Sequence, residues 1–431
     1  MRALCVIRPA DTAEVAATLS YCDRNRLKVV PQGGGTGLAG GARTVTGDVA
    51  LSLERLRKIE AIDVHGGTVI VEAGVPLQTL QEAALAAGLY YPVDFGARGS
   101  ATVGGTVATN AGGNSVIRYG MTREQVLGLE AVLADGTIVS SMNRLMKNNT
   151  GYDLKQLFIG SEGTLGVVTR AVMRLRPDPG NRTTAFIGLA CFDDVLSFLL
   201  TVSAQAGGTL SSFEVLWPSF IGHVLASGCH VLPLQERHNF YILLEIASDH
   251  SAEIVERVVE AAWEAGVISD AALAQSLSQA EAFWAIRDDI DALMSALKPA
   301  FMFDVSLNQT AMAHYITTLR EALSCRWADA ELVSFGHVAD GNLHIFICTG
   351  RLEDQAEVEA LVYAPLVPLG GSVSAEHGIG LEKRDFLAVS RNSDEISLMR
   401  RLKAVLDPNN TLNPGKVLRP PEGARSFQHG V

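Results

Sequence analysis

The sequence predicts an α+β protein with more than one domain. Its 431 residues exceed the size, about 250 to 300 residues, at which a single hydrophobic core stops growing. Short helical and strand-like runs alternate in the first 170 residues, which also contain three glycine-rich blocks. Beyond Pro177 glycine becomes rarer, and longer helical runs alternate with strands. We therefore expect an N-terminal ligand-binding domain followed by a second domain of mixed helices and strands.

The composition argues against several classes of protein. A formal net charge of -12 without long basic runs disfavours a nucleic-acid binder. The six cysteines never reach C-x-x-C spacing, which disfavours a cysteine zinc site or an iron–sulfur cluster. No apolar run reaches the ~18 residues needed to span a bilayer, and residues 1–10 lack the apolar core of a signal peptide. We expect a cytoplasmic protein, either free or peripheral to the membrane.

The first glycine-rich block follows a predicted helix over Thr12–Arg26 and a strand over Leu27–Pro31. It reads VVPQGGGTGLAGG, which satisfies the dinucleotide fingerprint G-x-G-x-x-G. A Rossmann glycine turn opens a helix, whereas residues 40–47 lack helical periodicity and lead into a strand over Asp48–Leu53. This context disfavours a nicotinamide site. It favours a loop whose backbone N–H groups approach a pyrophosphate, with a flexible surface loop as the alternative.

Two further blocks are rich in glycine and small residues. Residues 96–113 combine glycines with hydroxyl side chains, and residues 158–169 contain G-S-E-G-T-L-G followed by a β-rich run. Such stretches allow close approach of the backbone to a large flat ligand. Three blocks in one domain indicate a single elongated ligand contacted by several loops.

Together the three blocks resemble the flavin domain of the FAD-linked oxidase superfamily typified by vanillyl-alcohol oxidase. Relatives that attach FAD covalently often use a histidine near the first loop, where this chain has Thr36 and no histidine, so the resemblance implies noncovalent FAD. The residues that the resemblance assigns to FAD are Gly33, Gly34, Gly35, Thr36, Gly37, Ser100, Thr102, Gly105, Thr106, Thr109, Asn110, Glu162, Gly163, Gly166, Val168 and Asn413.

The resemblance also implies the domain organisation. Residues 1–177 form a two-part FAD-binding domain, and residues 178–404 form an α+β substrate cap domain with an antiparallel sheet and the metal site. Residues 405–431, with the sequence L-N-P-G-K, return to the FAD domain. Relatives usually carry additional N-terminal residues, so we expect either a complete chain or a mis-set start codon.

The strongest local signal is F-G-H-V-A-D-G-N-L-H-I-F over residues 335–346. Asp-Gly between β-rich runs predicts a hairpin with a two-residue turn at Asp340 and Gly341, which places His337 directly opposite His344. Opposed residues have Cβ atoms roughly 4.5 to 5.5 Å apart, close enough for two imidazoles to share a metal ion. The alternative is a hydrogen-bonded histidine pair on the face of a sheet.

Glu376 in S-A-E-H-G-I-G offers a third ligand, and the alternative is that this segment is an exposed loop. Two histidines and a carboxylate with an open position describe a catalytic site that suits zinc better than manganese or iron. The later motifs resemble the D-2-hydroxyglutarate dehydrogenase-like branch of the D-2-hydroxyacid dehydrogenases. In that branch the histidines matching His337 and His344 and the glutamate matching Glu376 bind the metal, and the histidine matching His377 is the base.

The chemistry of a 2-hydroxy acid is consistent with these assignments. Hydride transfer from Cα to the flavin becomes easier as the hydroxyl proton leaves, and histidine is suited to take that proton near neutral pH. A metal assists as a Lewis acid. We assign His377 as the base, Arg287 as the bidentate clamp on the substrate carboxylate, and Asn342 as a further catalytic residue. An exposed helical arginine is the alternative for Arg287.

The chain departs from its relatives where they recognise a second carboxylate. Hydroxyglutarate-type members carry K-Y-D-x-S-L-P, whose lysine, together with a threonine one helical turn beyond the arginine, holds the distal carboxylate. Here Met302 and Asp291 occupy the two positions. Loss of the cation and gain of an acid would disfavour a dicarboxylate. We therefore expect a substrate with an apolar, hydroxylated or cationic side chain.

These observations and the resemblance favour an FAD-dependent, metal-assisted dehydrogenase of a D-2-hydroxy acid, which is a small molecule. The alternatives are an oxidase that uses oxygen and a noncatalytic flavin subunit that passes electrons within a larger complex. A dehydrogenase requires an electron acceptor, for which a flavoprotein, a quinone and a cytochrome remain open. A homodimer also remains open.

Overall fold

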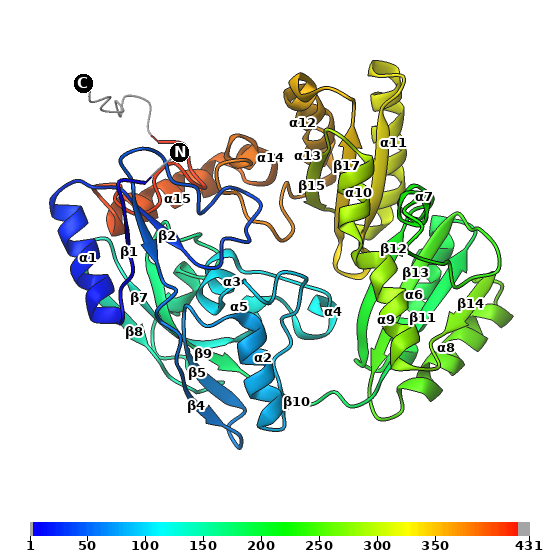
Figure 1. Ribbon diagram of the computed structural model, residues 1–431, viewed down its shortest axis with the longest axis horizontal. Coiled ribbons are helices and arrows are strands. Elements are labelled where there is room, and N and C mark those ends of the chain that lie inside the picture. The colour runs from blue at the N-terminus through cyan, green and yellow to red at the C-terminus, as the bar shows by residue number, and fades with distance from the viewer. Residues whose placement is uncertain (1–2, 421–431) are drawn as a thin grey trace.

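The computed structural model describes residues 3–420 and has two lobes (Figure 1). The N-terminal lobe contains two larger sheets, one two-stranded sheet and the first five helices, and the cap lobe contains one large sheet between two layers of helices. The last helix, α15 (Ser393–Leu406), lies against the N-terminal lobe, where Lys403 Nζ donates to Thr164 O at 2.8 Å. None of the helices between residues 3 and 420 has the length and apolar composition needed to cross a bilayer.

The N-terminal lobe combines a parallel and an antiparallel sheet. Its parallel sheet has the order β1 (Cys5–Ile7), β3 (Val49–Ser52), β2 (Val29–Gln32). Its five-stranded antiparallel sheet has the order β4 (Ile59–Asp63), β5 (Thr68–Glu72), β9 (Val167–Arg174), β7 (Val126–Val132), β8 (Ile138–Ser141). The helices are α1 (Thr12–Arg24), α2 (Leu77–Ala86), α3 (Val103–Thr109), α4 (Val116–Tyr119) and α5 (Thr122–Gln125). Short strands β6 (Leu89–Tyr90) and β10 (Arg176–Pro177) pair where the chain leaves this lobe.

Helix α1 shows why the predicted segments form where they do. Asp11 caps it by accepting a hydrogen bond from Glu14 N, and the helix buries Val15 and Leu19 at helical spacing. It ends two residues before the predicted Arg26, because Arg26 adopts a left-handed conformation with φ 58°. The glycine-rich stretch after β2 contains no helix before β3, as predicted.

The cap lobe is built on the predicted antiparallel sheet, which has seven strands. Their order is β14 (Asp270–Leu273), β11 (Arg182–Leu189), β13 (Phe240–Ala247), β12 (Leu210–Leu216), β16 (Glu331–His337), β17 (Asn342–Cys348), β15 (Phe301–Ser306). One face packs against α6 (Phe192–Ala206), α8 (Ser251–Glu264), α11 (Met312–Arg326) and α12 (Gln355–Tyr363). The other packs against α7 (Pro218–Ala226), α9 (Leu277–Asp288) and α10 (Ile290–Ala296). Short helices α13 (Leu366–Leu369) and α14 (Leu387–Ser390) precede α15.

The predicted register of the β16–β17 hairpin is wrong. His344 faces Phe335 and not His337, so the pairing is shifted by two residues. The reason is the connection: residues 338–340 form a 3-10 turn and Gly341 adopts a left-handed conformation, so Asp340 and Gly341 are not the centre of a two-residue turn. His337 instead pairs with Glu214 on β12.

Two groups of contacts join the distant parts of the chain. Between the lobes, Arg118 Nη1 donates to Ala247 O at 2.7 Å, and Ser212 Oγ donates to Asn114 O at 2.7 Å. In the C-terminal segment, Leu412 forms a parallel bridge with Val29 at the start of β2. The part of the predicted returning segment beyond residue 420 lies outside the described residues, as do residues 1 and 2.

Candidate active site

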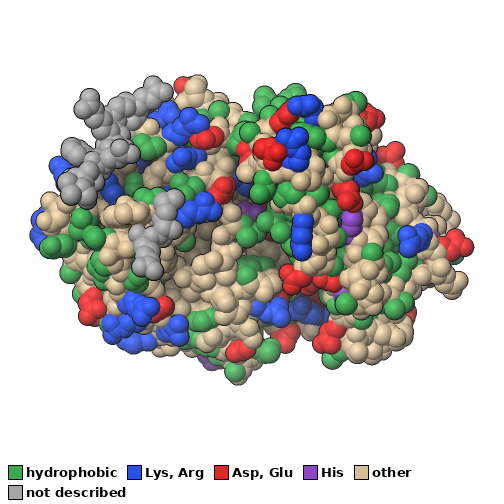
Figure 2. Space-filling model, turned by 45° about the horizontal axis from the view of Figure 1, so that its top comes forward, with side chains coloured by type: hydrophobic (Ala, Val, Ile, Leu, Met, Phe, Trp, Pro, Cys, Tyr) green, Lys and Arg blue, Asp and Glu red, His purple; other side chains and the backbone are tan. Residues whose placement is uncertain are grey.

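A cavity of about 320 Å³ lies among the glycine-rich blocks of the N-terminal lobe. Figure 2 shows the molecule hollowed between its two lobes. The residues predicted to bind FAD that line the cavity are Gly33, Gly34, Gly35, Thr36, Gly37, Thr102, Gly105, Thr106, Thr109, Glu162, Gly163, Gly166, Val168 and Asn413. Glu376 and His377 of the cap also line it, so the cofactor site and the predicted catalytic residues border one space.

Gly33 and Gly34 of the first glycine loop are packed too closely to accept side chains. A Cβ atom at Gly34 would lie 1.8 Å from Ser100 O, and one at Gly33 would lie 2.5 Å from Thr102 Oγ1. Gly35 has φ +71°, which glycine adopts without strain. These features form a cradle of backbone that fits the pyrophosphate of a dinucleotide such as FAD.

Two residues predicted to bind FAD do not line the cavity. Ser100 is exposed, and its carbonyl oxygen packs against the Cα of Gly34 where a Cβ atom would otherwise lie. Asn110 ends α3 in a left-handed conformation, and its Oδ1 accepts a hydrogen bond from Arg123 N at 2.9 Å. Both residues therefore shape the glycine-rich loops from outside the cavity.

Glu162 connects the flavin-side loop to the cap. Its carboxylate accepts hydrogen bonds from Ile379 N at 2.7 Å and Gly380 N at 2.9 Å. Burial raises the pKa of this carboxyl, and the two amide donors oppose that rise. Gly380 has φ +49°, and a Cβ there would lie 2.0 Å from Ala39 O, so the E-H-G-I-G segment requires glycine at this position.

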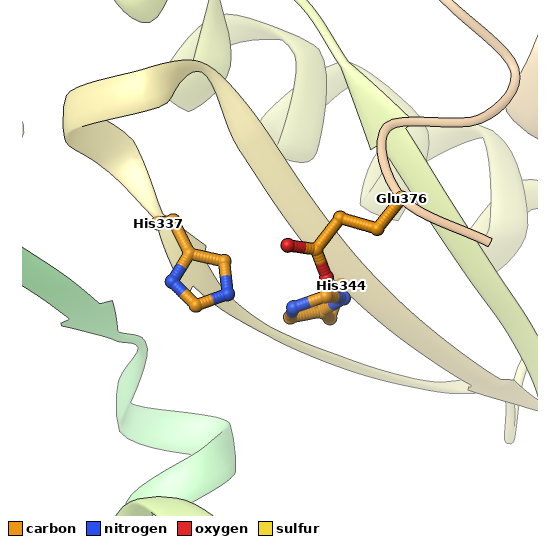
Figure 3. Close-up of side chains that lie close together, drawn as sticks. All are labelled: His337, His344 and Glu376. Carbon is orange, nitrogen blue, oxygen red and sulfur yellow. The ribbon is translucent and has the colours of Figure 1, made fainter. Parts of the chain in front are cut away.

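His337, His344 and Glu376 converge on one point (Figure 3). Each offers one ligand atom, and the three atoms lie within 4.8 Å of one another. The two imidazole rings have centroids 5.3 Å apart at an interplanar angle of 82°. The histidines meet although they are not directly opposed, because both project from the face of the sheet that packs against α9. The donor set fits a divalent metal with two nitrogen ligands and one carboxylate ligand.

Glu214 supports this cluster and was not identified from the sequence. It is fully buried on β12, accepts from His337 Nδ1 at 2.5 Å and accepts from Arg287 Nε at 3.0 Å. Burial opposes its charge, but His337 and Arg287 lower the pKa of Glu214 to about 2. Burial likewise opposes the charge on His337, but Glu214 raises the pKa of His337 to about 9. The sequence signal that could have identified Glu214 is an acidic residue within the strand L-S-S-F-E-V-L, which otherwise carries no charge.

Arg287 lies beside the same cluster near the end of α9. Its Nη2 is 3.3 Å from His337 Nε2, and its Nη1 donates to Asp288 at 3.3 Å. The side chain is buried, not exposed on its helix, and its guanidinium lies 5.3 Å over the Phe335 ring. The planar group is thus held in one orientation next to the proposed metal ligands.

Asp304 is the second supporting acid that the sequence analysis did not assign. It is fully buried on β15, faces His344 across the strand pair, and lies 3.8 Å from Lys383 Nζ. Burial opposes its charge, but His377, Lys383 and His344 together hold its pKa well below its usual range. As with Glu214, an acid in an apolar run, F-M-F-D-V-S, was the only sequence signal.

The predicted base, His377, lies at the edge of the cavity with 30% of its side chain exposed. Its ring is nearly parallel to that of His344, with centroids 6.3 Å apart. Asn342, also predicted to be catalytic, donates from Nδ2 to Asp304 Oδ1 at 2.7 Å. Glu376 Oε1 accepts from Gly113 N of the other lobe at 3.0 Å. His377, Glu376 and Asn342 therefore belong to one connected group.

Two family models match the chain. The model for the C-terminal domain of FAD-linked oxidases matches residues 178–417, and the model for an FAD binding domain matches residues 3–141. The chain belongs to the FAD-linked oxidase family. This FAD-linked oxidase is an oxidoreductase, and FAD is its cofactor.

Relatives place it in the D-2-hydroxyacid dehydrogenase branch. It is 40% identical over 423 residues to a D-2-hydroxyglutarate dehydrogenase of Xanthomonas citri pv. viticola, covering 96% of this chain and 89% of the relative. It is 39% identical to the mitochondrial D-2-hydroxyglutarate dehydrogenase of Bos taurus, covering 96% and 76%. It is 36% identical to a putative mitochondrial D-lactate dehydrogenase of Schizosaccharomyces pombe, covering 96% and 81%.

Solved structures with similar folds agree with the predicted two-domain architecture. p-Cresol methylhydroxylase with bound substrate has a TM-score of 0.75 at 15% identity and covers 96% of this chain and 88% of its own. 4-Ethylphenol oxidase from Gulosibacter chungangensis has a TM-score of 0.74 at 18% identity, with 97% and 90% covered. At these identities the likeness shows the fold alone.

The packing of the glycine loop predicts the effect of a single methyl group. Gly34→Ala should weaken FAD binding roughly tenfold or more, because a clash with a backbone carbonyl forces a shift that costs about 1 to 3 kcal/mol. Gly37→Ala is the matched control, since nothing lies within 4 Å of its Cβ position. FAD dissociation constants measured by fluorescence on apoprotein provide the test. Equal FAD affinities of the two variants would contradict the proposed packing of this loop's backbone against the pyrophosphate.

Proposed function

We propose that this FAD-linked oxidase oxidises a D-2-hydroxy acid to the 2-oxo acid by hydride transfer to noncovalent FAD, with the help of a divalent metal. The observation that carries the proposal is the arrangement of His337, His344 and Glu376, which lies next to His377 at the edge of the FAD cavity. A subunit that only passed electrons would have no need for a metal site and a base at this position. The cluster therefore favours an enzyme over that alternative.

Bound FAD supplies the hydride acceptor, and a metal bound at the cluster supplies Lewis acidity to the substrate hydroxyl. His377 takes the hydroxyl proton at the exposed edge of its ring. Arg287 orients the substrate carboxylate with its Nη atoms, whose contacts with Asp288 and His337 at 3.3 Å are longer than the 3.0 Å contact of Nε with Glu214. Asn342 acts by holding Asp304, which contacts the loop that carries the base.

Zinc is the metal that we propose. Two imidazoles and a carboxylate with an open fourth position are typical of catalytic zinc. Glu214 at His337 Nδ1 is the kind of carboxylate partner that orients a metal-binding histidine and leaves Nε2 for the metal. Manganese and iron accept similar ligands and are the alternatives.

The charges around the site support a substrate with a single carboxylate. Arg287 is already paired with Glu214 and Asp288, and Lys383 lies beside Asp304. On the other lobe, Arg98 makes two hydrogen bonds to Asp94. A second substrate carboxylate would have to compete with an existing acid for any of these three cations. We therefore propose a 2-hydroxy acid with an apolar, hydroxylated or cationic side chain.

Met302 and Asp291 support this substrate class through the residues that they replace, a lysine and a threonine of hydroxyglutarate-type relatives. Met302 is exposed on β15, two residues from Asp304 on the same face of the sheet. Asp291 is exposed in the first turn of α10, and the break between α9 and α10 at Asp289 means that it does not lie one turn beyond Arg287 on the same helix, as the sequence had suggested. The names of several relatives favour D-2-hydroxyglutarate as the second candidate.

Flavin reduction tests the activity directly. Anaerobic addition of D-2-hydroxy acids should bleach the bound flavin, whereas L-enantiomers should leave it oxidised. Reoxidation of the reduced protein by oxygen then separates an oxidase from a dehydrogenase. Flavin that no 2-hydroxy acid reduces would contradict the proposed reaction.

Acid precipitation tests the attachment of FAD. The yellow chromophore should remain in the supernatant, because the glycine loop offers Thr36 and no histidine for a covalent bond. Flavin retained in the protein pellet would exclude the noncovalent assignment.

Removal of one metal ligand should separate metal binding from FAD binding. His344→Ala should lose the metal and lower turnover roughly 100-fold or more, since a Lewis acid contributes several kcal/mol to such a step. FAD should remain bound, because His344 does not line the FAD cavity. Exposed His314 on α11 provides the control variant His314→Ala. Full activity in a preparation shown by elemental analysis to be metal-free would overturn the metal site.

Relative kcat/KM values test the substrate class. D-lactate and larger D-2-hydroxy monocarboxylates should exceed D-2-hydroxyglutarate, because a second carboxylate would compete with the acids already paired with Arg98, Arg287 and Lys383. The double variant Met302→Lys, Asp291→Thr should gain activity on D-2-hydroxyglutarate. A clear preference of the unaltered enzyme for D-2-hydroxyglutarate would overturn the monocarboxylate proposal and leave the proposed reaction intact.

A further inference from the structure

We propose that Asp304 is a shared positioning residue, which orients both the metal ligand His344 and the base His377 through one buried carboxylate. This inference rests on the proposed function, because it assigns Asp304 a role only if a metal and a base act at this site. Its basis is that Asp304 accepts hydrogen bonds from the backbone of Glu376 and His377 and also faces the imidazole rings of His344 and His377.

The first part of the geometry is a backbone anchor. Asp304 Oδ2 accepts hydrogen bonds from Glu376 N at 2.9 Å and from His377 N at 3.0 Å. Asp304 Oδ1 accepts from Asn342 Nδ2 at 2.7 Å. A single side chain on β15 thus joins β17 to the loop that carries the third metal ligand and the base.

The second part concerns the two imidazoles. Asp304 Oδ1 lies 3.7 Å from His344 Nδ1, and Asp304 Oδ2 lies 3.8 Å from His377 Nδ1. The carboxylate therefore faces the Nδ1 side of both rings and favours a proton on that nitrogen. Nε2 is then available on His344 for a metal and on His377 for the substrate proton. One acid sets equivalent orientations for two residues with different roles.

The third part is the surroundings, which keep this acid charged and fixed. Lys383 is buried, donates from Nζ to Asp304 O at 3.3 Å and lies 3.8 Å from Oδ2. A buried carboxylate is stable only with such partners, since removal of one partner of a buried ion pair leaves an uncompensated charge away from water. Lys383 and the three N–H donors stabilise the charge of Asp304, so the imidazole nitrogens are not required for that purpose.

The test compares Asp304→Asn with the unaltered holoenzyme. Asparagine has nearly the same size but carries no charge and offers a single acceptor oxygen, so it cannot accept from Glu376 N, His377 N and Asn342 Nδ2 together. Zinc affinity, measured by competition with a chromophoric chelator, should fall about 10- to 100-fold. kcat should fall far more than KM rises, and FAD should stay bound.

A matched control separates positioning from stability. Glu245 is another buried carboxylate on the same sheet, with Trp284 Nε1 at 3.2 Å and Arg182 at 3.4 Å. Glu245→Gln likewise replaces a buried carboxylate by an amide, but it should leave zinc affinity unchanged.

The outcomes distinguish this inference from the proposed function. If the unaltered protein binds zinc and Asp304→Asn retains both its zinc affinity and its kcat, the positioning role is overturned while the proposed function stands. If Glu245→Gln loses zinc affinity to the same extent, the effect is general destabilisation and the positioning role is also overturned. An unaltered protein without affinity for zinc or another divalent metal overturns the metal site itself, and this inference with it.

Discussion

The arrangement of the site depends on how residues 376–380 are held. This segment carries a proposed metal ligand and the proposed base, yet it belongs to no helix or strand. Two carboxylates, one buried and one half-buried, hold it from opposite lobes. Asp304 of the cap accepts from the amides of Glu376 and His377, and Glu162 of the N-terminal lobe accepts from the amides of Ile379 and Gly380. Because charge-assisted hydrogen bonds to N–H groups are strong, these four contacts give a loop the rigidity of a regular element.

The buried acids also explain why the site is polar inside an otherwise apolar lobe. Glu214 and Asp304 have no exposed side-chain surface beyond 1%, and charge at such positions is costly unless it is paired. Each acid faces a cation and an imidazole: Arg287 and His337 for Glu214, Lys383 and His344 for Asp304. Apolar residues of similar size would pack there at no electrostatic cost. The retained charges are therefore best explained by the orientation that they impose on the histidines.

The sequence predicted the local features well and the long-range pairings poorly. Glycine spacing located the loops of the cavity, and residue type identified His337, His344 and Glu376 as a group. The turn chemistry of Asp340 and Gly341 suggested the wrong register, because tertiary contacts favour a 3-10 turn there over a two-residue turn. The supporting acids were missed because their partners come from the strand order β12-β16-β17-β15, in which neighbours lie far apart in the sequence. No local pattern specifies that order.

The connection between the lobes has a consequence for how a substrate must be held. Glu376 belongs to the cap but accepts from Gly113 N of the N-terminal lobe, while Arg118 and Ser212 fix the same edge of the interface. The proposed metal ligand Glu376 is therefore held by contacts from both lobes. Hydride transfer requires the reacting atoms to lie about 3 to 3.5 Å apart, and a shift of 1 Å is sufficient to slow such a step strongly. The docked lobes already hold residues 376–380 in place. The cap therefore does not have to move to bring the proposed metal ligand and base into position.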